Sequence, residues 1–326
     1  MQKQIDLGPD RPAEPRTTAA GLRPIDLLAV VCLVGCCASW GLNQVAMKVA
    51  NDGITPVFQA SIRSAIAAVL IWLWCVGRGI PLFARDGTLM PGMVSGLLFS
   101  ANFMFIGPGL SLTEASRGVL FLYTAPFFVA IGAHYLLPGD RLSLLKVAGL
   151  LAAFAGLVIS VSDRLVLDGA RANMMGDFYC LAAGFFWAAT TLVIRATSLR
   201  TISAEKNLFY ELVVSTPILL LASWHAGEAG IVNLSPLIVW SFLYTTVIVV
   251  FISYAVWFWL LNTYPASQVS VFTFLGPIFA VAAGHFLLGE QITWRLGAAL
   301  VLVAVGIYLV NKPQSRPQII GPPQPF

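Results

Sequence analysis

The chain has 326 residues, of which 58% are hydrophobic and only 10% charged, with a mean hydropathy of +0.83 and a formal net charge of +4. A water-soluble core cannot bury so large an apolar fraction, so the composition excludes a soluble globular protein and indicates one embedded in a bilayer. The 5 cysteines all fall inside apolar segments, where a free thiol behaves as a small hydrophobic side chain. Neither a metal site nor a cofactor is expected.

The two ends of the chain differ from everything between them. Residues 1–26 mix proline, aspartate, arginine and threonine without an apolar run, which predicts a disordered tail rather than a signal peptide. Residues 312–326 are proline-rich and are predicted to be a second disordered tail outside the membrane.

Between the tails lie ten segments that are apolar enough to be transmembrane helices. A helix needs about 20 apolar residues to cross the hydrocarbon core of a bilayer. The sequence therefore predicts an all-α polytopic membrane protein with ten transmembrane helices. These cover about residues 27–50, 56–77, 91–110, 117–137, 144–162, 177–196, 207–224, 236–261, 267–288 and 294–311.

The distribution of cations predicts the orientation of these helices. If residue 1 lies in the cytoplasm, 13 lysines and arginines fall on the cytoplasmic side and 5 on the other, with Arg63 inside a helix. Cytoplasmic loops carry an excess of these residues. We expect a multi-pass protein of the cell (inner) membrane with both termini cytoplasmic. The net positive charge reflects this asymmetry, so nucleic acid is not an expected partner.

The fourth and ninth segments are similar to each other. Residues 115–137 and 266–288 align without a gap and match at 8 of 23 positions, including Pro126 with Pro277. Alanine and leucine recur by chance in apolar helices, but a proline in the same frame is harder to explain in that way. The similarity indicates an internal duplication.

The first and sixth segments support the duplication. WGLNQVAMK at residues 40–48 parallels WAATTLVIR at residues 187–195, since both begin with tryptophan and a small residue and end with a cation. The predicted organisation is a first five-helix repeat at 27–162, a connecting loop at 163–176 and a second five-helix repeat at 177–311. Because five is odd, the repeats are predicted to be inverted, as in many secondary transporters that work by alternating access.

The order of these features resembles the EamA-type proteins of the drug/metabolite transporter superfamily, over about residues 27 to 311. The resemblance implies a small-molecule carrier of the bacterial inner membrane, often an exporter of amino acids or other metabolites. The first copy departs from the family's Gly-Glu motif and reads Pro138-Gly139-Asp140. The residues that carry the resemblance are Trp40-Gly41, Lys48, Pro56, Arg63, Pro126, Trp187-Ala188, Pro277 and Gly289-Glu290.

Arg63 is the candidate for recognition of a charged solute. A charged side chain in mid-bilayer costs about 2.5 to 3.5 kcal/mol on insertion scales, so it faces the protein interior or a water-filled cavity. The helix is predicted to begin with Thr55 as N-cap and Pro56 as its first residue, which places Gln59 on the same face as Arg63. Arg63 either holds a substrate carboxylate or is neutralised by a partner such as Glu211 or by carbonyls of a kinked backbone. The sequence leaves both interpretations open.

Aromatic and amide side chains within the predicted helices suit a cavity for an amphipathic solute, because they combine apolar area with polar tips. Packing, the interfacial belt and hydrogen bonds between helices are the alternative roles. The predicted substrate-binding residues are Trp40, Asn43, Gln44, Gln59, Arg63, Phe103, Tyr123, Trp187, Thr191, Tyr210, Tyr254 and Trp257.

Two charge pairs and two prolines are candidates for gating. Inversion places Lys48 near Glu290 at the outer end and Arg195 near Asp140 at the inner end, and each pair is predicted to latch one gate. Prolines in the middle of helices remove a backbone hydrogen bond and bend the helix, which suits a moving element or a static kink. The gating residues predicted are Lys48, Asp140, Arg195, Glu290, Pro126 and Pro277.

Catalytic motifs are absent from the sequence: it has no H-E-x-x-H, no G-x-S-x-G and no phosphate-binding loop. The prediction is a secondary transporter of small organic metabolites, with export of amino acids or related zwitterionic or anionic solutes as the first interpretation. A nucleotide-sugar or lipid-precursor transporter is the alternative within this class, and a polytopic membrane enzyme or a channel the alternative outside it. Expected partners are a small-molecule substrate and the lipid bilayer. A proton as coupling ion, and a monomer or homodimer, are left open.

Overall fold

The structure, a computed structural model, describes residues 22–113, 115–167, 174–288 and 294–312. These residues form helices and connecting loops, and one isolated β-bridge joins Ile54 to Ile231. Ten helices in the described ranges are long and apolar enough to cross a membrane, which confirms the predicted fold class and all ten predicted segments. The predicted tails fall largely outside the described residues.

The membrane-spanning segments are called spans 1 to 10 in chain order. Spans 1 to 3 are α1 (Leu27–Asn51), α2 (Pro56–Arg78) and α3 (Leu89–Leu112), span 4 is α4 (Ala115–Leu122) with α5 (Ala125–Leu136), and span 5 is α6 (Leu144–Leu167). Spans 6 and 7 are α7 (Met174–Ala196) and α8 (Ala204–His225), joined through η1 (Ser198–Thr201). Span 8 is α9 (Pro236–Leu243), η2 (Tyr244–Ser253) and α10 (Tyr254–Thr263), span 9 is α11 (Ala266–Ser270), η3 (Val271–Phe274) and α12 (Leu275–Leu288), and span 10 is α13 (Trp294–Asn311).

The connection between the halves is shorter than predicted. The helix of span 5 runs to Leu167 and that of span 6 begins at Met174, so helix extends into both ends of the predicted loop 163–176. The helix continues past Ser162 through Asp163 and Arg164 to the apolar residues 165–167.

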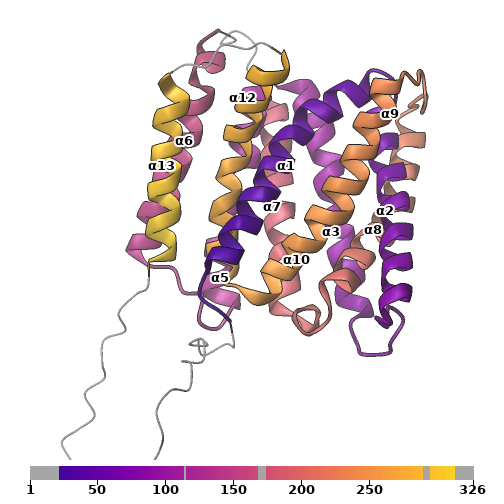
Figure 1. Cartoon of the computed structure of the whole chain (residues 1–326), viewed down its shortest axis with the longest axis horizontal. Helices are drawn as coiled ribbons and strands as arrows, with labels where there is room; N and C mark the ends of the chain where they lie inside the picture. Colours follow the sequence, from indigo (N-terminus) through magenta and orange to yellow (C-terminus); the bar gives the residue numbers. More distant parts are fainter. Residues whose placement is uncertain (1–21, 114, 168–173, 289–293, 313–326) are drawn as a thin grey trace, which may run out of the picture.

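The bundle has two ends, which we call the tail face and the far face. The tail face, the lower edge of Figure 1, carries the start of α1, the end of α13 and the loops 79–88, 137–143, 197–203 and 263–265. The far face carries the loops 52–55 and 226–235. Backbone hydrogen bonds hold the loops of each face together: Arg23 donates to Thr263 on the tail face, and Val232 donates to Gly53 on the far face.

The first helix of each half runs in the opposite direction through the bundle. The α1 helix begins on the tail face, whereas α7 begins beside Thr113, where α3 reaches the far face. There the hydroxyl of Thr113 donates to the Asp177 carboxylate at 2.7 Å. The helix contacts also correspond between the halves. Span 1 packs against spans 8 and 9, and span 6 against spans 3 and 4, while spans 2 and 7 pack on each other, as do spans 5 and 10.

Spans 4 and 9 are both interrupted just before their prolines. The helix of span 4 breaks between Leu122 and Ala125, and Pro126 lies in the first turn of α5. In span 9 the chain tightens into the 3₁₀-helix η3 before α12, whose first turn contains Pro277. A proline has no N–H to donate to the preceding turn, which favours an interruption at that level. The predicted bends are therefore breaks in the helix.

The start of α2 differs in one detail from the prediction. Thr55 occupies the N-cap position, but its hydroxyl makes no capping hydrogen bond. The N–H groups of Val57 and Phe58 donate instead to the carboxylate of Glu228, at 3.0 and 2.7 Å. A carboxylate is a stronger acceptor than a hydroxyl and complements the positive end of the helix dipole, so Glu228 takes the capping role.

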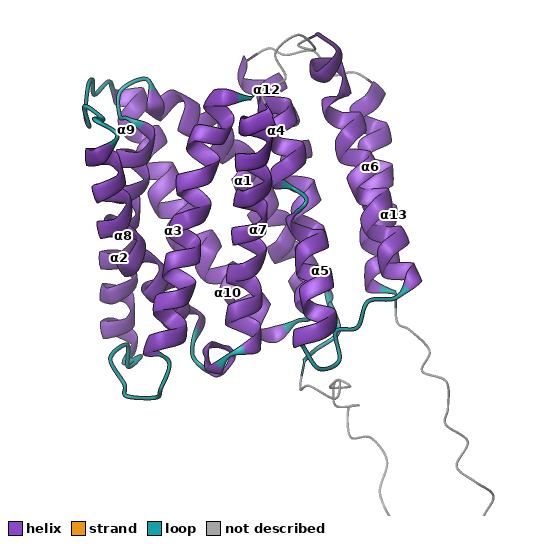
Figure 2. Cartoon of the chain, turned by 180° about the vertical axis from the view of Figure 1, so that it is seen from behind, coloured by secondary structure: helices purple, strands orange, loops and turns teal. Residues whose placement is uncertain are grey.

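Spans 5 and 10 form a pair at one edge of the bundle, side by side in both views (Figures 1 and 2). Their backbones meet at glycines: a methyl group added to Gly149 would lie 2.7 Å from the carbonyl oxygen of Gly306. Small residues allow such close approach between membrane helices. This pair covers the bundle without contributing any of the predicted substrate-binding residues.

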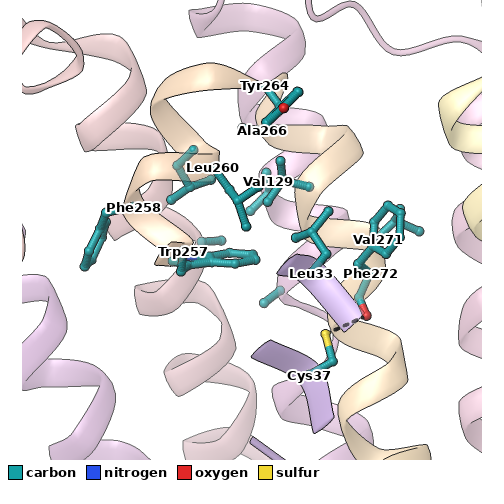
Figure 3. Close-up of a cluster of buried hydrophobic side chains, with 14 of the residues drawn as sticks. Leu33, Cys37, Val129, Trp257, Phe258, Leu260, Tyr264, Ala266, Val271 and Phe272 are labelled. Atoms are coloured by element: carbon teal, nitrogen blue, oxygen red, sulfur yellow. Dashed lines mark hydrogen bonds between the residues drawn. The ribbon is translucent and has the colours of Figure 1, made fainter. Parts of the chain in front are cut away.

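The apolar core lies where α1 meets spans 8 and 9 (Figure 3). Leu33 and Leu260 are fully buried there, with Trp257 beside them. The thiol of Cys37 donates to the carbonyl oxygen of Phe272 in η3 at 3.2 Å, drawn as the dashed line in Figure 3. The first span of one half is thereby attached to the interrupted span of the other.

Candidate functional site

An aromatic cluster surrounds Trp40 in the middle of α1. Its ring centroid lies 5.1 Å from that of Trp257, 6.2 Å from Tyr254 and 6.4 Å from Trp187, all edge to face. Trp187 in turn lies 5.9 Å from Tyr123 of span 4. Edge-to-face contacts at these distances are favourable because the ring edge is positive and the ring face negative. The cluster brings together five predicted substrate-binding residues from spans 1, 4, 6 and 8.

The cluster continues through span 3 to the charged candidate. Phe99 lies 6.2 Å from Tyr254 and 5.0 Å from Phe103, and the guanidinium carbon of Arg63 lies 5.3 Å from the centroid of Phe103. A desolvated cation over an aromatic face is stabilised by about 2 kcal/mol. The rings therefore form a continuous path from the centre of the bundle to Arg63.

Around Arg63 lies a buried polar cluster from spans 1 and 2. Arg63 is 3% exposed and donates from Nη1 to the sulfur of Met47 at 3.6 Å, and Asn43 donates to the same sulfur at 3.2 Å. Gln59, one helical turn before Arg63 and on the same face, is 0% exposed. A thioether sulfur is a weak acceptor, so these contacts are poor substitutes for hydrogen bonds to oxygen.

Several polar atoms of this cluster have no hydrogen-bond partner among the described residues. They are Nε of Arg63, both amide atoms of Gln59 and the amide oxygen of Asn43. Most buried polar groups in folded proteins are hydrogen-bonded, and those that are not call for an explanation such as a ligand or an ordered water. Within the described ranges Arg63 forms no ion pair, with Glu211 or any other acid. The structure therefore does not support neutralisation by Glu211.

Span 8 presents Tyr254 through an unusual backbone. The ten residues of η2 form a π-helix that ends at Ser253, directly before Tyr254. Ser253 accepts a hydrogen bond from the indole nitrogen of Trp40 at 2.9 Å and donates to the carbonyl of Val249 at 2.6 Å. π-Helical turns are rare and occur often at functional sites. This segment fixes both Tyr254 and the polar tip of Trp40.

A small cavity lies between the halves, at the level of the two breaks. It is lined by residues of spans 4, 6, 8 and 9, namely Ala125, Pro126, Val129, Trp187, Thr191, Trp257, Ser270 and Thr273. The cavity has room for about one water molecule. The hydroxyl of Thr191 donates back to the carbonyl of Trp187 at 3.2 Å. This part of the protein is therefore closed around its centre.

A larger groove of about 720 Å³ opens elsewhere, between α2, the start of α8 and α10 on the tail-face half. Its lining is mostly apolar, with Trp74, Phe251 and Trp259 among its residues, and includes the polar side chains of Ser203, Glu205 and Asn262. None of the predicted substrate-binding residues lines it.

Two predicted residues lie apart from the cluster or cannot be placed. Tyr210 is at the tail-face end of α8, where its hydroxyl lies 3.1 Å from that of Thr88 and its ring 5.8 Å from Nζ of Lys206. The structure thus separates Tyr210 from the other aromatic candidates. The backbone of Gln44 belongs to α1, and its side chain lies outside the described part of the chain.

At the tail face, Asp140 joins the two halves, but not through Arg195. The carboxylate of Asp140 binds Nζ of Lys146 at 2.6 Å and accepts from the backbone N–H of Ser267 at 3.0 Å and from its hydroxyl. Nζ of Lys146 also donates to the Ser267 hydroxyl at 3.1 Å. Gly139, at φ 88°, lies in the turn that brings Asp140 to the start of α11, where backbone N–H groups have no partner within the helix.

The other members of the two predicted charge pairs are Arg195, predicted at the tail face, and Lys48 with Glu290, predicted at the far face. Arg195 is 7% exposed, and its Nε has no partner among the described residues. It lies within electrostatic range of Asp140 but forms no ion pair with it in the described structure, so the predicted latch between the two stays a prediction. Lys146 lies nearer along the chain and takes that position. Glu290 and the side chain of Lys48 lie outside the described residues.

Some residues of the site were not predicted. Met47 and Phe99 complete the polar and aromatic clusters, and Lys146 and Ser267 complete the contact at Asp140. Phe99 stands four residues before Phe103, a spacing that places both on one helix face. That spacing was a usable signal. The contact of Ser267 with Asp140 depends on the packing of two distant loops and had no local signal.

Ten apolar helices, with aromatic and polar side chains gathered inside the bundle, define a polytopic all-α membrane protein with a buried candidate site. A model of the EamA-like transporter family matches residues 27–162 and again residues 174–312. The chain belongs to the EamA-like transporter family. It is a multi-pass membrane transporter and not an enzyme.

Individual proteins are similar over most of the chain. The uncharacterized transporter YoaV of Bacillus subtilis is 25% identical over 86% of this chain and 95% of its own length. A protein of Escherichia coli named a probable amino-acid metabolite efflux pump is 24% identical over 83% of this chain and 90% of its own length. One crystal structure superposes with a TM-score of 0.72, at 16% identity, over 86% of this chain and 96% of the other, which shows a shared fold.

Proposed function

We propose that this transporter exports amino acids, or related zwitterionic or anionic solutes, by alternating access. The observation that carries this proposal is the group of polar atoms around Arg63 that have no hydrogen-bond partner among the described residues. A solute carboxylate would pair with the Arg63 guanidinium, whose planar donors suit that group. The ammonium group of the solute would donate to the amide oxygens of Asn43 and Gln59, which have no partner among the described residues.

The aromatic cluster supports the same class of solute. Phe103 and Tyr254 lie between Arg63 and the tryptophans of the central cluster. A solute held at Arg63 by its charged end would extend an apolar side chain over these rings. Sites of this kind combine a mainly apolar lining with a few convergent polar groups.

Alternating access is supported by the arrangement of the halves. The α1 and α7 helices start on opposite faces, each half has five spans, and the contacts of the two halves correspond when the halves are exchanged. We infer that they are inverted repeats. Inverted repeats give a transporter two related conformations, with the substrate site near the level where the repeats meet and helices are discontinuous. The breaks in spans 4 and 9 lie at that level.

The direction and location are proposed from charge and from the relatives. The tail face carries a marked excess of lysine and arginine, so it would face the cytoplasm of a cell with the protein in its inner membrane. Probable amino-acid metabolite efflux pumps of Escherichia coli and Salmonella typhimurium are 24% and 26% identical to this chain. Export of the same class of solute is the corresponding proposal here.

The test is counterflow of a panel of labelled amino acids in proteoliposomes containing the full chain. We expect saturable exchange in the wild type, and in Arg63→Ala an apparent KM raised about 10- to 100-fold, as for the loss of a charged hydrogen-bonded contact. Arg78→Ala is the matched control, because Arg78 ends the same helix and lies over Trp74 at 5.2 Å, away from the cluster. Equal effects of the two substitutions, or no saturable exchange of any amino acid in the panel, would refute the proposal.

A further inference from the structure

Glu211 is a buried acid that the proposed site does not use. It lies in the first half of α8, is 0% exposed, and faces α3. Its Oε1 accepts a hydrogen bond from the hydroxyl of Ser95 at 2.7 Å. Its Oε2 has no partner in the described part of the chain.

The helices packed against α8 supply no cation to this carboxylate. Those helices are α2, α3 and α10. The α3 helix has no titratable side chain, α10 contributes only Tyr254, and the cations of α2 are Arg63 and Arg78. None of these groups is bonded to Glu211 in the described structure. On α8 itself, Lys206 binds Asp86 on the tail face.

A carboxylate with these surroundings is unfavourable in its charged form. Removing an ionised carboxylate from water costs far more than one neutral hydrogen bond can offset, so such groups are paired or become neutral. The cost is greatest inside a bilayer, where acids mark ion and proton pathways. Glu211, with a single hydroxyl donor and a free oxygen, has the surroundings of a protonated carboxyl group.

We propose that Glu211 is the proton-binding site that couples this transporter to the proton gradient. It holds a proton in the closed conformation seen here. When the site opens to the cytoplasm, the Oε–H bond breaks and the proton passes to water, leaving the carboxylate. When the site opens to the other side, the carboxylate takes a proton from water, so each cycle of solute export admits one proton.

Tyr254 connects this acid to the proposed substrate site. Its ring belongs to the aromatic cluster, and its hydroxyl lies within electrostatic range of both Arg63 and Glu211. Protonation of Glu211 therefore changes the field at the place where the solute would bind. This coupling rests on the proposed function, whereas the protonation of Glu211 does not.

The first test measures protonation without any substrate. Infrared difference spectra of the purified full chain at neutral pH, wild type minus Glu211→Gln, are expected to show the carbonyl stretch of a protonated carboxyl group. Asp52→Asn, which alters an exposed acid on the far face, should leave that band in place. Absence of the band from the wild type, or its survival in Glu211→Gln, would overturn the proposal.

The second test measures coupling in proteoliposomes with labelled amino acids. Glutamine resembles a neutral carboxyl group in shape, so Glu211→Gln is expected to keep its melting temperature and its counterflow, but to lose stimulation of transport by a pH gradient. Glu211→Asp should recover part of that stimulation. A gradient response in Glu211→Gln equal to wild type would refute coupling. A wild type without amino-acid counterflow would refute the proposed function, and the infrared band would still decide the protonation of Glu211.

Discussion

Asp86 and Lys206 form an ion pair, with 2.7 Å between Oδ2 and Nζ, that ties the loop after α2 to the first turn of α8. A corresponding contact exists on the other face, where Glu228, in the loop after α8, binds the first turn of α2. Each of these helices is thus held at its start by an acid from the loop that follows the other. Spans 2 and 7 form a pair fixed at both faces, and we expect the spans around them to move during transport.

The ion pair on the tail face makes stability depend on pH in a defined range. The hydrogen bonds from Lys206 and then Thr88 lower the pKa of the Asp86 carboxyl to about 2. Because this pKa lies below the unfolded value of about 3.9, the carboxylate stabilises the folded state fully at a pH above about 3.9. That stabilisation is lost as the pH falls toward about 2. We expect Asp86→Asn to lower the melting temperature in detergent at about pH 6, and the difference from wild type to shrink between about pH 4 and about pH 2. A difference that stays constant with pH would contradict this account.

The carboxylate on the far face is expected to contribute as a helix cap. Besides its bonds to α2, Glu228 accepts from the hydroxyl of Ser223 at 2.6 Å. Glu228→Ala removes the acceptor of two N–H groups and should reduce the free energy of unfolding by about 1–2 kcal/mol, as for the loss of a strong cap. Thermal unfolding of the purified protein measures this. Asp52→Ala, on the same face, should have little effect, and a similar loss in both variants would rule out a capping role.

The membrane helices could be predicted from the sequence because lipid imposes a simple rule: about 20 apolar residues must be consecutive. A bend at Pro126 and Pro277 could also be predicted, since neither has an N–H to donate. That it becomes an interruption could not, because Pro108 and Pro217 lie inside the continuous helices α3 and α8. The π-helix η2 could not, because its sequence of β-branched and aromatic residues is compatible with an ordinary α-helix. It packs against α1 and α2, which are distant in the sequence, and one chain segment by itself does not reveal such contacts.

The clusters were predictable as residue types but not as contacts. Trp40 and Trp187 were found through the repeat, and Arg63 through the cost of charge in a bilayer. The partners of Asp140 were not, because Lys146 and Ser267 bind it while Arg195 lies only within electrostatic range of it, and nothing local in the sequence distinguishes the two cations. Choices between neighbours of similar chemistry depend on ångström-scale packing, which one sequence does not encode locally.

The contact of Asp140 with Lys146 and Ser267 is predicted to hold the tail face closed. It joins the loop that follows span 4 to the start of span 9. Spans 4 and 9 are the two interrupted spans. Asp140→Asn weakens the bonds to both partners, so the tail face should open more often. In a cysteine-free background, a cysteine at Ser270, which lines the central cavity, should then react faster with a membrane-impermeant maleimide applied from that face.

The control for this experiment alters an acid on the same face that takes no part in the contact. Asp86→Asn breaks the fixed pair of spans 2 and 7 and should leave the labelling rate at Ser270→Cys unchanged. The double variant Asp140→Lys with Lys146→Asp exchanges the two charges, and we expect it to restore slow labelling only in part. The remaining difference from wild type reflects the lost hydrogen bond from the N–H of Ser267, which a lysine cannot accept. An Asp140→Asn variant that labels at the wild-type rate would show that this contact is not a gate.

Two glycines in α1 provide a matched pair for testing how closely spans 1 and 9 must approach. A methyl group at Gly41 would lie 2.6 Å from Cβ of Phe279 and 2.7 Å from the backbone nitrogen of Ala280, whereas one at Gly35 would meet nothing within 4 Å. We expect Gly41→Ala to cost about 1–3 kcal/mol through overpacking and to slow transport, because a backbone contact cannot yield as a flexible side chain does. Gly35→Ala should leave stability unchanged or raise it by up to about 1 kcal/mol, since alanine favours helix over glycine. Both variants are compared with the wild type by melting temperature and by counterflow. Equal behaviour of the two would mean that span 9 does not pack closely against α1 beside Trp40.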